Sequence, residues 1–228
     1  MDPLDFHRAL DGVDPEECLV VILSKSFTTA ETLLNTRTVK KWLVGHYQSS
    51  HPEVSEEKII SSHFCAVSSN IKLTSEFGIS PERVFGFWDW VGGRFSVSSA
   101  IGILELSIVF GYSISEQFLS GMNDIDQNFK TESDWQKNIP VFLGLVGFYQ
   151  STIQEFESRA ILPYSQALCR FAAHIQQVDM ESNGKSVTLS GEDLVGYRAG
   201  VINFGEPGTN SQHSFFQLLH QGKKKNNF

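Results

Sequence analysis

Three short apolar runs near the start of the chain constrain its fold more than any other feature. The first run, residues 18–23, is followed by a polar segment and then by apolar residues at helical spacing over residues 30–44. The second and third runs are residues 64–67 and 84–87, and a helix is predicted between them at residues 71–77. Strands that alternate with helices form parallel sheets, so this part predicts an α/β fold.

Glycines mark the predicted helix ends. We expect Gly45 to end the first helix and Gly78 to end the second, because glycine readily adopts the conformations that close helices. After Arg94 the pattern becomes helix-rich. It predicts helices at residues 96–110, 114–129 and 139–157, a strand at 160–162, a helix at 164–177, a glycine-rich loop, and a last helix at 214–221.

Composition and charge exclude several classes of protein. The formal net charge of -8 argues against a nucleic-acid backbone as the main partner. The N-terminus has no apolar signal sequence, and no apolar stretch approaches the ~20 residues that span a bilayer, which predicts a cytosolic protein without a membrane partner. The cysteines at 18, 65 and 169 are odd in number and widely spaced, so we expect buried free thiols rather than a zinc site or disulfides.

A run rich in hydroxyl groups, Ser24 to Thr29, joins the first predicted strand to the helix after it. In a parallel sheet this junction lies at the carboxyl end of the strand, where ligands bind. The free amides at the start of the helix, the hydroxyls and Lys25 together suit a phosphate group. Simple capping of the helix by Thr28 or Thr29 explains the same residues, and the run lacks the glycine pattern of a P-loop.

Three further residues are compatible with a catalytic role and also with a structural one. Arg94 follows two glycines after the third predicted strand, where it either steadies an anionic intermediate or lies exposed on a packed turn. Glu181, expected on a polar turn after a helix, can act as a general base, although most such carboxylates are only solvated. His213 can exchange protons near neutral pH, or it is structural, as we expect for His174 and His220. No spacing predicts a catalytic triad, a metal site or a nucleotide cofactor.

Five segments, in order along the chain, carry a family resemblance. They are Ser24–Thr32, Phe87–Ser96, Ile161–Gln166, Met180–Lys185 and Gly205–Asn210. Together they resemble the glucose-6-phosphate isomerase family over about residues 2–222. The resemblance implies a three-layer α/β/α fold of the sugar-isomerase type, with a parallel sheet and an incomplete second domain. It also implies a cofactor-free aldose–ketose isomerase that interconverts glucose 6-phosphate and fructose 6-phosphate in glycolysis and gluconeogenesis.

The resemblance assigns roles to particular residues. Glu181 would move a proton between C1 and C2 of the sugar through an enediol, and Arg94 would stabilise the negative charge of that intermediate. Gln177 would contact the substrate, and His213 would help to open the sugar ring in the site of the other subunit of a homodimer. The phosphate would be held by Ser24, Lys25, Ser26, Thr28 and Thr29.

The resemblance also implies how the chain is divided. Residues 1–110 would form a phosphosugar-binding α/β domain without its first strand region, residues 111–222 a helix-rich segment and the start of a second α/β domain, and residues 223–228 a disordered tail. The family's upstream Gly-Ser loop and C-terminal catalytic lysine have no counterpart, so the alternative prediction is a non-catalytic phosphosugar-binding remnant or a truncated fragment of that enzyme. Ser211 replaces a family glycine, which predicts strain if φ is positive there, and the polar stretch 148–158 predicts weaker helix packing.

Overall fold

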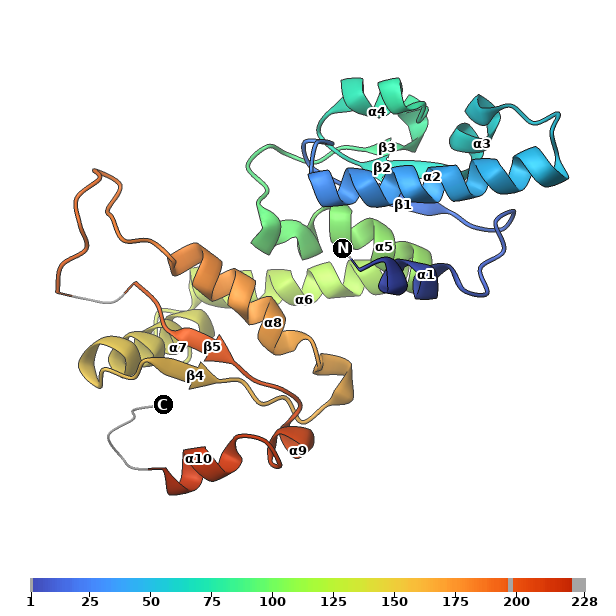
Figure 1. The fold of residues 1–228 in the computed structure, drawn as a ribbon. Helices are drawn as coiled ribbons and strands as arrows, with labels where there is room; N and C mark the ends of the chain where they lie inside the picture. The colour runs from blue at the N-terminus through green and yellow to red at the C-terminus, as the bar shows by residue number, and fades with distance from the viewer. Residues whose placement is uncertain (1, 197–198, 223–228) are drawn as a thin grey trace. The chain divides into compact units, whose positions relative to one another are not determined.

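Two compact units make up the chain, Met1–Ser115 and Glu116–Phe228. The structure is a computed structural model that describes residues 2–196 and 199–222, so the predicted tail at residues 223–228 lies outside the described residues. Each unit contains a parallel sheet with helices beside it (Figure 1). Among the helices of the described residues, none is long and apolar enough to cross a membrane.

The first unit is built on three parallel strands in the order β1-β2-β3. Val20 of β1 pairs with Phe64 of β2, and Ala66 of β2 pairs with Val84 of β3. This sheet confirms the α/β prediction, although β3 ends two residues early because β2 offers no partner beyond Val67. The elements of this unit are α1 (Pro3–Leu10), β1 (Val20–Leu23), α2 (Ala30–Ser50), α3 (Glu56–His63), β2 (Phe64–Val67), α4 (Ile71–Phe77), η1 (Pro81–Arg83), β3 (Val84–Phe85), η2 (Gly93–Ser98) and α5 (Ala100–Phe110).

The two predicted helix ends have different outcomes. Gly78 ends α4 in the left-handed conformation at φ 104°, as predicted. Helix α2 continues past Gly45, so the other prediction is wrong. A glycine inside a helix costs only about 1 kcal/mol relative to alanine. Burial of Leu43, and a 2.9 Å hydrogen bond between the Tyr47 hydroxyl and His63 Nε2, hold the helix on both sides of the glycine.

Helices α1 and α3 are not predicted from the sequence. A side-chain cap at the start of each helix explains why it forms. Asp2 accepts a hydrogen bond from the Leu4 amide at 2.9 Å, and Ser55 accepts one from the Lys58 amide at 3.3 Å. Each cap satisfies an amide that the helix leaves free at its start.

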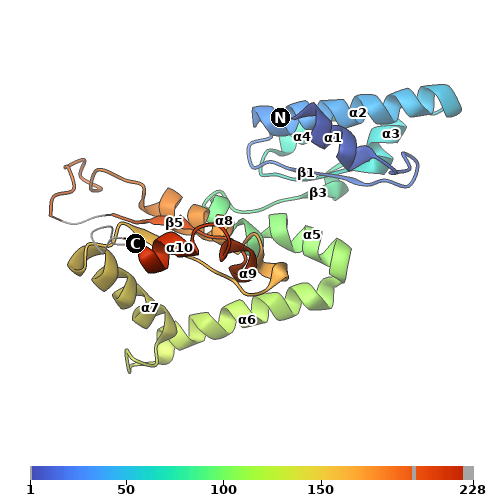
Figure 2. The same ribbon diagram turned by 60° about the horizontal axis from the view of Figure 1, so that its bottom comes forward.

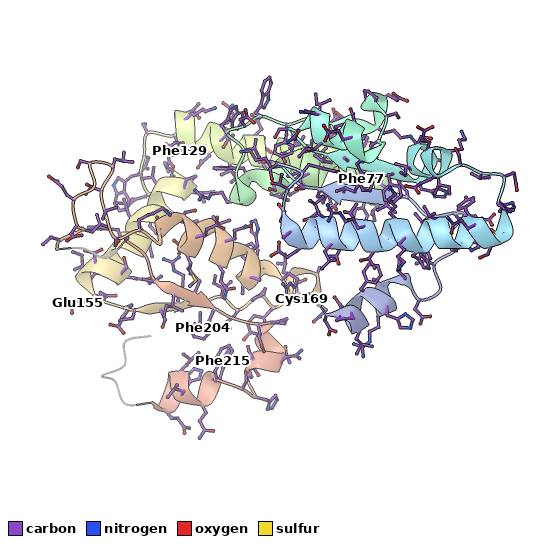
Figure 3. The ribbon with its side chains drawn as sticks, turned by 45° about the horizontal axis from the view of Figure 1, so that its top comes forward. Phe77, Phe129, Glu155, Cys169, Phe204 and Phe215 are labelled. Atoms are coloured by element: carbon purple, nitrogen blue, oxygen red, sulfur yellow. The ribbon has the colours of Figure 1, made fainter. Side chains whose placement is uncertain are left out.

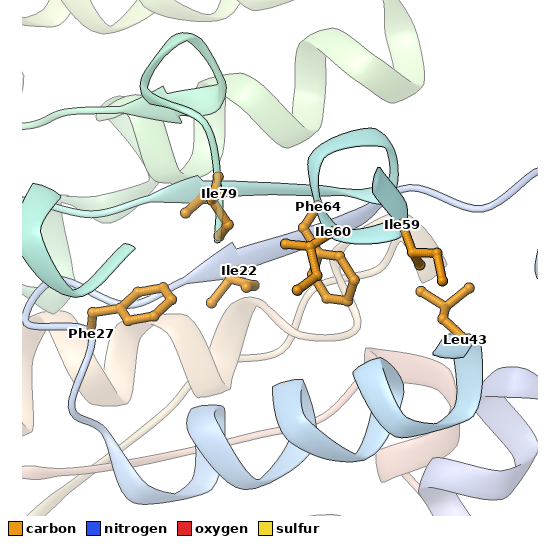
Figure 4. Close-up of a cluster of buried hydrophobic side chains, with 8 residues drawn as sticks. Ile22, Phe27, Leu43, Ile59, Ile60, Phe64 and Ile79 are labelled. Atoms are coloured by element: carbon orange, nitrogen blue, oxygen red, sulfur yellow. The ribbon is translucent and has the colours of Figure 1, made fainter. Parts of the chain in front are cut away.

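One hydrophobic cluster holds the first unit together (Figure 4). Helix α2 supplies Leu43, which is 0% exposed, and strand β2 supplies Phe64, also 0% exposed. The ring of Phe77 packs edge-on against Phe64 at 5.7 Å, which brings α4 onto the same cluster. The buried members are Ile22, Phe27, Leu43, Ile59, Ile60, Phe64, Ala66 and Ile79.

Truncating the buried leucine of this cluster tests its importance. Leu43→Ala is expected to lower the free energy of unfolding by about 2–5 kcal/mol, because it leaves a cavity in a packed core. Leu34→Ala is the matched control on the same helix, since Leu34 is 56% exposed; its expected effect is about 0.5 kcal/mol or less. Urea denaturation followed by circular dichroism measures both, and equal losses would show that the cluster does not dominate stability.

In the second unit a two-stranded parallel sheet pairs Arg159 of β4 with Asn203 of β5. Helix α8 and its π-helical continuation η5 run back along this sheet, opposite in direction to both strands (Figures 1 and 2). The elements are α6 (Tyr112–Thr131, which starts in the first unit), α7 (Ile139–Phe148), η3 (Tyr149–Ile153), β4 (Ser158–Ala160), η4 (Gln166–Leu168), α8 (Phe171–Ile175), η5 (Gln176–Glu181), β5 (Ile202–Phe204), α9 (Gly208–Ser211) and α10 (Phe216–Gln221).

Several boundaries in this unit differ from the sequence prediction. The helix predicted at residues 139–157 ends at Phe148 and passes into a π-helical turn, and Glu155 takes a positive φ of 60° that stops helical structure (Figure 3). The polar stretch 148–158 therefore leaves the α-helix through a π-helical turn and ends at the first residue of β4. Likewise, the helix predicted at residues 164–177 starts later and extends to Glu181.

The expectation of three buried thiols is partly wrong. Cys65 is buried, Cys18 is half-buried and Cys169 is exposed (Figure 3), and none of the three forms a disulfide. Burial raises the pKa of the Cys65 thiol above its usual value. Cys169 follows the short turn η4 rather than the longer predicted helix, which leaves it at the surface.

Candidate active site

The loops that leave the three strands of the first unit meet at the carboxyl edge of its sheet. The Ser24 amide donates to the Val67 carbonyl at 3.1 Å, which continues the pairing of β1 with β2. The Lys25 carbonyl then accepts hydrogen bonds from the Ser68 hydroxyl at 3.1 Å and from the Ser69 amide and hydroxyl at 3.1 and 2.8 Å. The loop after β2 thus fixes the backbone of the loop after β1.

Phe27 gives the Ser24–Thr29 loop its shape. Its φ of 54° is left-handed, which is unusual and costly for a large L-residue. Its ring is only 3% exposed and meets the Phe77 ring edge-on at 6.0 Å. Burial of this ring offsets the backbone strain, and the polar neighbours on both sides are left at the surface.

The start of helix α2 has free amides. Thr29 occupies the capping position, but its side chain makes no capping hydrogen bond. The Thr28 hydroxyl pairs instead with the Ser26 hydroxyl at 2.5 Å, and Ser24 Oγ lies 3.4 Å from Thr29 Oγ1. Capping of α2 therefore does not account for the hydroxyl groups of Ser26, Thr28 and Thr29. Exposed hydroxyls and unpaired amides at the positive end of a 21-residue helix form a surface suited to an anion.

Lys25 joins this loop to the segment after β3. Its ammonium group donates to the Asp89 carbonyl, and to the Val91 carbonyl at 3.3 Å. Arg94, at the start of η2, is half-buried, and no described carboxylate forms an ion pair with it. The guanidinium is thus available to an anion, whereas Trp88 and Trp90 on the same segment are 70% and 76% exposed.

Removing the Lys25 ammonium group tests this connection. Lys25→Met is expected to raise hydrogen–deuterium exchange at residues 89–93, because two carbonyl contacts of that segment are lost. Lys41→Met, at an exposed lysine of α2, is the control and should leave exchange there unchanged. Unchanged exchange in both variants, measured by mass spectrometry, would show that Lys25 does not hold the segment.

In the second unit, Gln177 and Glu181 lie on η5 and are exposed. Glu181 therefore lies on the last π-helical turn, not on the polar turn after a helix that the sequence predicts. Contacts of η5 with β5 prolong the helix. The Glu181 carboxylate has no hydrogen bond or ion pair with another described residue, and Lys185 Nζ instead contacts the Glu181 carbonyl at 2.9 Å.

Helix α9, which His213 follows, lies beyond the carboxyl end of β5, whereas η5 ends near the start of that strand (Figure 1). Within this unit the structure does not bring Glu181 and His213 together. His213 is exposed and follows α9, where Ser211 is fully buried and donates to the Gly208 carbonyl at 2.9 Å. Ser211 is helical, so the predicted strain at a positive φ is absent.

Two of the family-like segments pack against each other here. At Gly205, φ is 156°, and a Cβ atom would lie 1.8 Å from the Ile161 carbonyl oxygen. At Gly208 a Cβ atom would lie 2.4 Å from the Tyr164 ring. Both positions require glycine, because the backbone after β5 touches the chain after β4. These contacts give the motif residues a structural role. They also fix the backbone that leads from β5 to His213.

Some residues of these sites carry no sequence pattern of their own. Ser68, Ser69 and Asn70 hold the Ser24–Thr29 loop in place, and Asn70 Nδ2 donates to the Ser26 carbonyl at 3.0 Å. The signal that finds them is a polar run directly after a predicted strand, at the edge where the first loop lies. Asp179 and Asn203 share a 2.6 Å hydrogen bond in the second unit, and no sequence spacing indicates that pair.

Comparison with known proteins decides the family. The family model described as phosphoglucose isomerase matches residues 1–225. The chain belongs to the phosphoglucose isomerase family. It is 51% identical over 223 residues to "Glucose-6-phosphate isomerase, cytosolic A" of Oryza sativa subsp. japonica and 52% identical to "Glucose-6-phosphate isomerase" of Plasmodium falciparum. These matches cover 98% of this chain but only 38% and 36% of those two proteins.

Solved structures agree with this family and fold. A glucose-6-phosphate isomerase from Chlamydia trachomatis matches with a TM-score of 0.84 and 37% identity, covering 97% of this chain and 40% of that one. A hypothetical protein from Thermus thermophilus matches with a TM-score of 0.77 at 23% identity, covering 98% of this chain and 49% of that one, and shares the fold. The sugar-isomerase type of α/β fold predicted from the sequence is thereby confirmed.

Proposed function

We propose that this chain carries the phosphate-binding and proton-transfer groups of an aldose–ketose isomerase acting on glucose 6-phosphate and fructose 6-phosphate. The observation that carries the proposal is the start of α2, where the hydroxyls of residues 24–29 gather beside helix amides that no side chain caps. A phosphate there would meet Ser24, Lys25, Ser26, Thr28 and Thr29.

The proton transfer needs a base and a group that holds negative charge. Glu181 suits the base because its carboxylate is exposed and has no partner among the described residues. Abstraction of the proton next to a carbonyl places negative charge on oxygen, and an unpaired guanidinium such as that of Arg94 stabilises it. Gln177, four residues before Glu181 on the same turn, would contact the sugar hydroxyls. No step in this scheme calls for a cofactor or a metal.

A homodimer and a cytosolic location are part of the same proposal. Within the second unit, η5 with Glu181 ends beside the start of β5, whereas His213 follows α9, which comes after the end of that strand. This separation supports ring opening by His213 in the site of a second subunit of a homodimer. Several relatives, including that of Zea mays at 52% identity, are named cytosolic, and we infer the same location here. The net charge of -8 argues against a nucleic-acid backbone as the main partner, whereas a locally positive site on an acidic protein can still hold a small anionic substrate.

Replacing the proposed base tests the chemistry. Glu181→Gln keeps the size of the side chain but removes its basicity, and kcat for fructose 6-phosphate formation should fall by roughly 10²–10⁴-fold. Glu192→Gln, an exposed glutamate in the same unit, is the control and should retain the wild-type rate. A coupled assay of the 228-residue chain measures both; equal activity of the two variants would contradict the proposed base.

A second candidate function, phosphosugar binding without turnover, is favoured by one observation. All the proposed phosphate-binding groups lie within the first unit, so binding there does not depend on Glu181 or His213. The chain also spans 38% of the length of the rice relative, so turnover by this chain is a separate matter from binding.

Melting temperatures with and without fructose 6-phosphate distinguish binding from catalysis. The substrate should raise the melting temperature of the wild-type chain and of Glu181→Gln, because a ligand that binds the native state stabilises it. The Ser26→Ala, Thr28→Ala double variant should lose the shift, since it removes the paired hydroxyls of the loop. A shift that survives in the double variant would place the phosphate elsewhere.

A further inference from the structure

The inner face of η5 carries a second carboxylate, Asp179, that the proposed reaction does not use. We propose that Asp179 is a positioning residue that fixes the turn bearing Gln177 and Glu181 on the β4–β5 sheet. This inference rests on the proposed function, because that function gives the turn its chemical task. The argument concerns only residues of the second unit.

The Asp179 carboxylate is held from three directions. Asn203 Nδ2 of β5 donates to Oδ2 at 2.6 Å, and Asn183 Nδ2 donates to Oδ1 at 2.5 Å. Arg159 Nη1 of β4 lies 3.5 Å from Oδ2, with the Asp179 side chain only 19% exposed. Both strands of the sheet and the residues after η5 therefore converge on one carboxylate.

Asn203 is tied to the same turn by its backbone. Its carbonyl accepts from Gln176 Nε2 at 3.0 Å, and its amide donates to the Met180 sulfur at 3.4 Å. The residue is 1% exposed. Side chains of η5 thus satisfy the backbone groups of Asn203, which would otherwise form an open edge of the strand.

The geometry of a helical turn links this contact to the proposed base. Residues two apart point to nearly opposite faces of a helix, whereas residues four apart share a face. Asp179 points to the sheet, and Gln177 and Glu181 are exposed on the other side. π-helical turns are rare and occur often at functional sites. Loss of the inner contact should therefore change the direction of the outer side chains.

The orientation of the Asn203 side-chain amide supports the same positioning role for Asp179. Among the buried side-chain atoms of the described residues, its Oδ1 is the one that has no hydrogen-bond partner. The opposite orientation would direct this oxygen at the Asp179 carboxylate, where the two acceptors repel. The amide nitrogen faces Asp179, and the unsatisfied oxygen is the cost of that contact.

Kinetics of the 228-residue chain test the proposal. Asp179→Ala and Asn203→Ala should each lower kcat by ~10-fold or more with KM changed less than about twofold, because small misplacements of catalytic groups reduce kcat strongly. The double variant should lose little more than either single variant, since both remove one interaction. Asp179→Asn, which keeps an acceptor for Asn203 Nδ2, should recover much of the rate. Asp126→Ala, an exposed carboxylate of α6, is the control and should be unchanged.

Amide exchange separates failure of this inference from failure of the proposed function. If the wild-type chain has no turnover, the proposed isomerase activity fails for this chain, and exchange at residues 177–181 decides the positioning role. Faster exchange there in Asp179→Ala than in Asp126→Ala supports it. The inference is overturned if exchange is equal in both variants, or if an active chain loses melting temperature but keeps kcat in Asp179→Ala.

Discussion

The parallel pairing of β1, β2 and β3 is the constraint on which the proposed phosphate site depends. Because all three strands point the same way, the loops after them meet at one edge of the sheet. Hydrogen bonds then join them in series: Ser69 holds the Lys25 carbonyl, and the Lys25 ammonium group holds the Val91 carbonyl. The proposed anion site at the start of α2 therefore depends on strand direction and on the hydrogen bonds that join these loops.

The hydrophobic cluster beneath this edge makes the loop conformation possible. The left-handed φ of Phe27 is tolerated because its ring is buried in this cluster and meets Phe77 of α4. The proposed base has a comparable support in the second unit, where Asn203 in the interior of a three-residue strand meets Asp179 of a π-helical turn. In both units, a buried contact places exposed polar groups where they are available to a ligand.

The sequence predicts what depends on local pattern and misses what depends on tertiary contact. The apolar runs of β1 and β2, and Gly78 at the end of α4, follow from periodicity and glycine chemistry alone. Helix α2 continues past Gly45, and η5 extends to Glu181. Both helices are held by residues that are distant in sequence. The family resemblance supplies the proposed site residues, whereas the pair of Asp179 and Asn203 emerges only from hydrogen bonds in the structure.

The central claim is that Glu181 moves a proton through an enediol between C1 and C2 of a sugar phosphate. Incubating the 228-residue chain with glucose 6-phosphate in D2O, and following the products by NMR, tests it directly. The account predicts that fructose 6-phosphate forms with solvent deuterium at C1 in part of the molecules, because a carboxylic acid formed during transfer exchanges its proton with water. Fructose 6-phosphate that forms without any deuterium would contradict the account, since the hydrogen would then move without passing through an exchangeable acid.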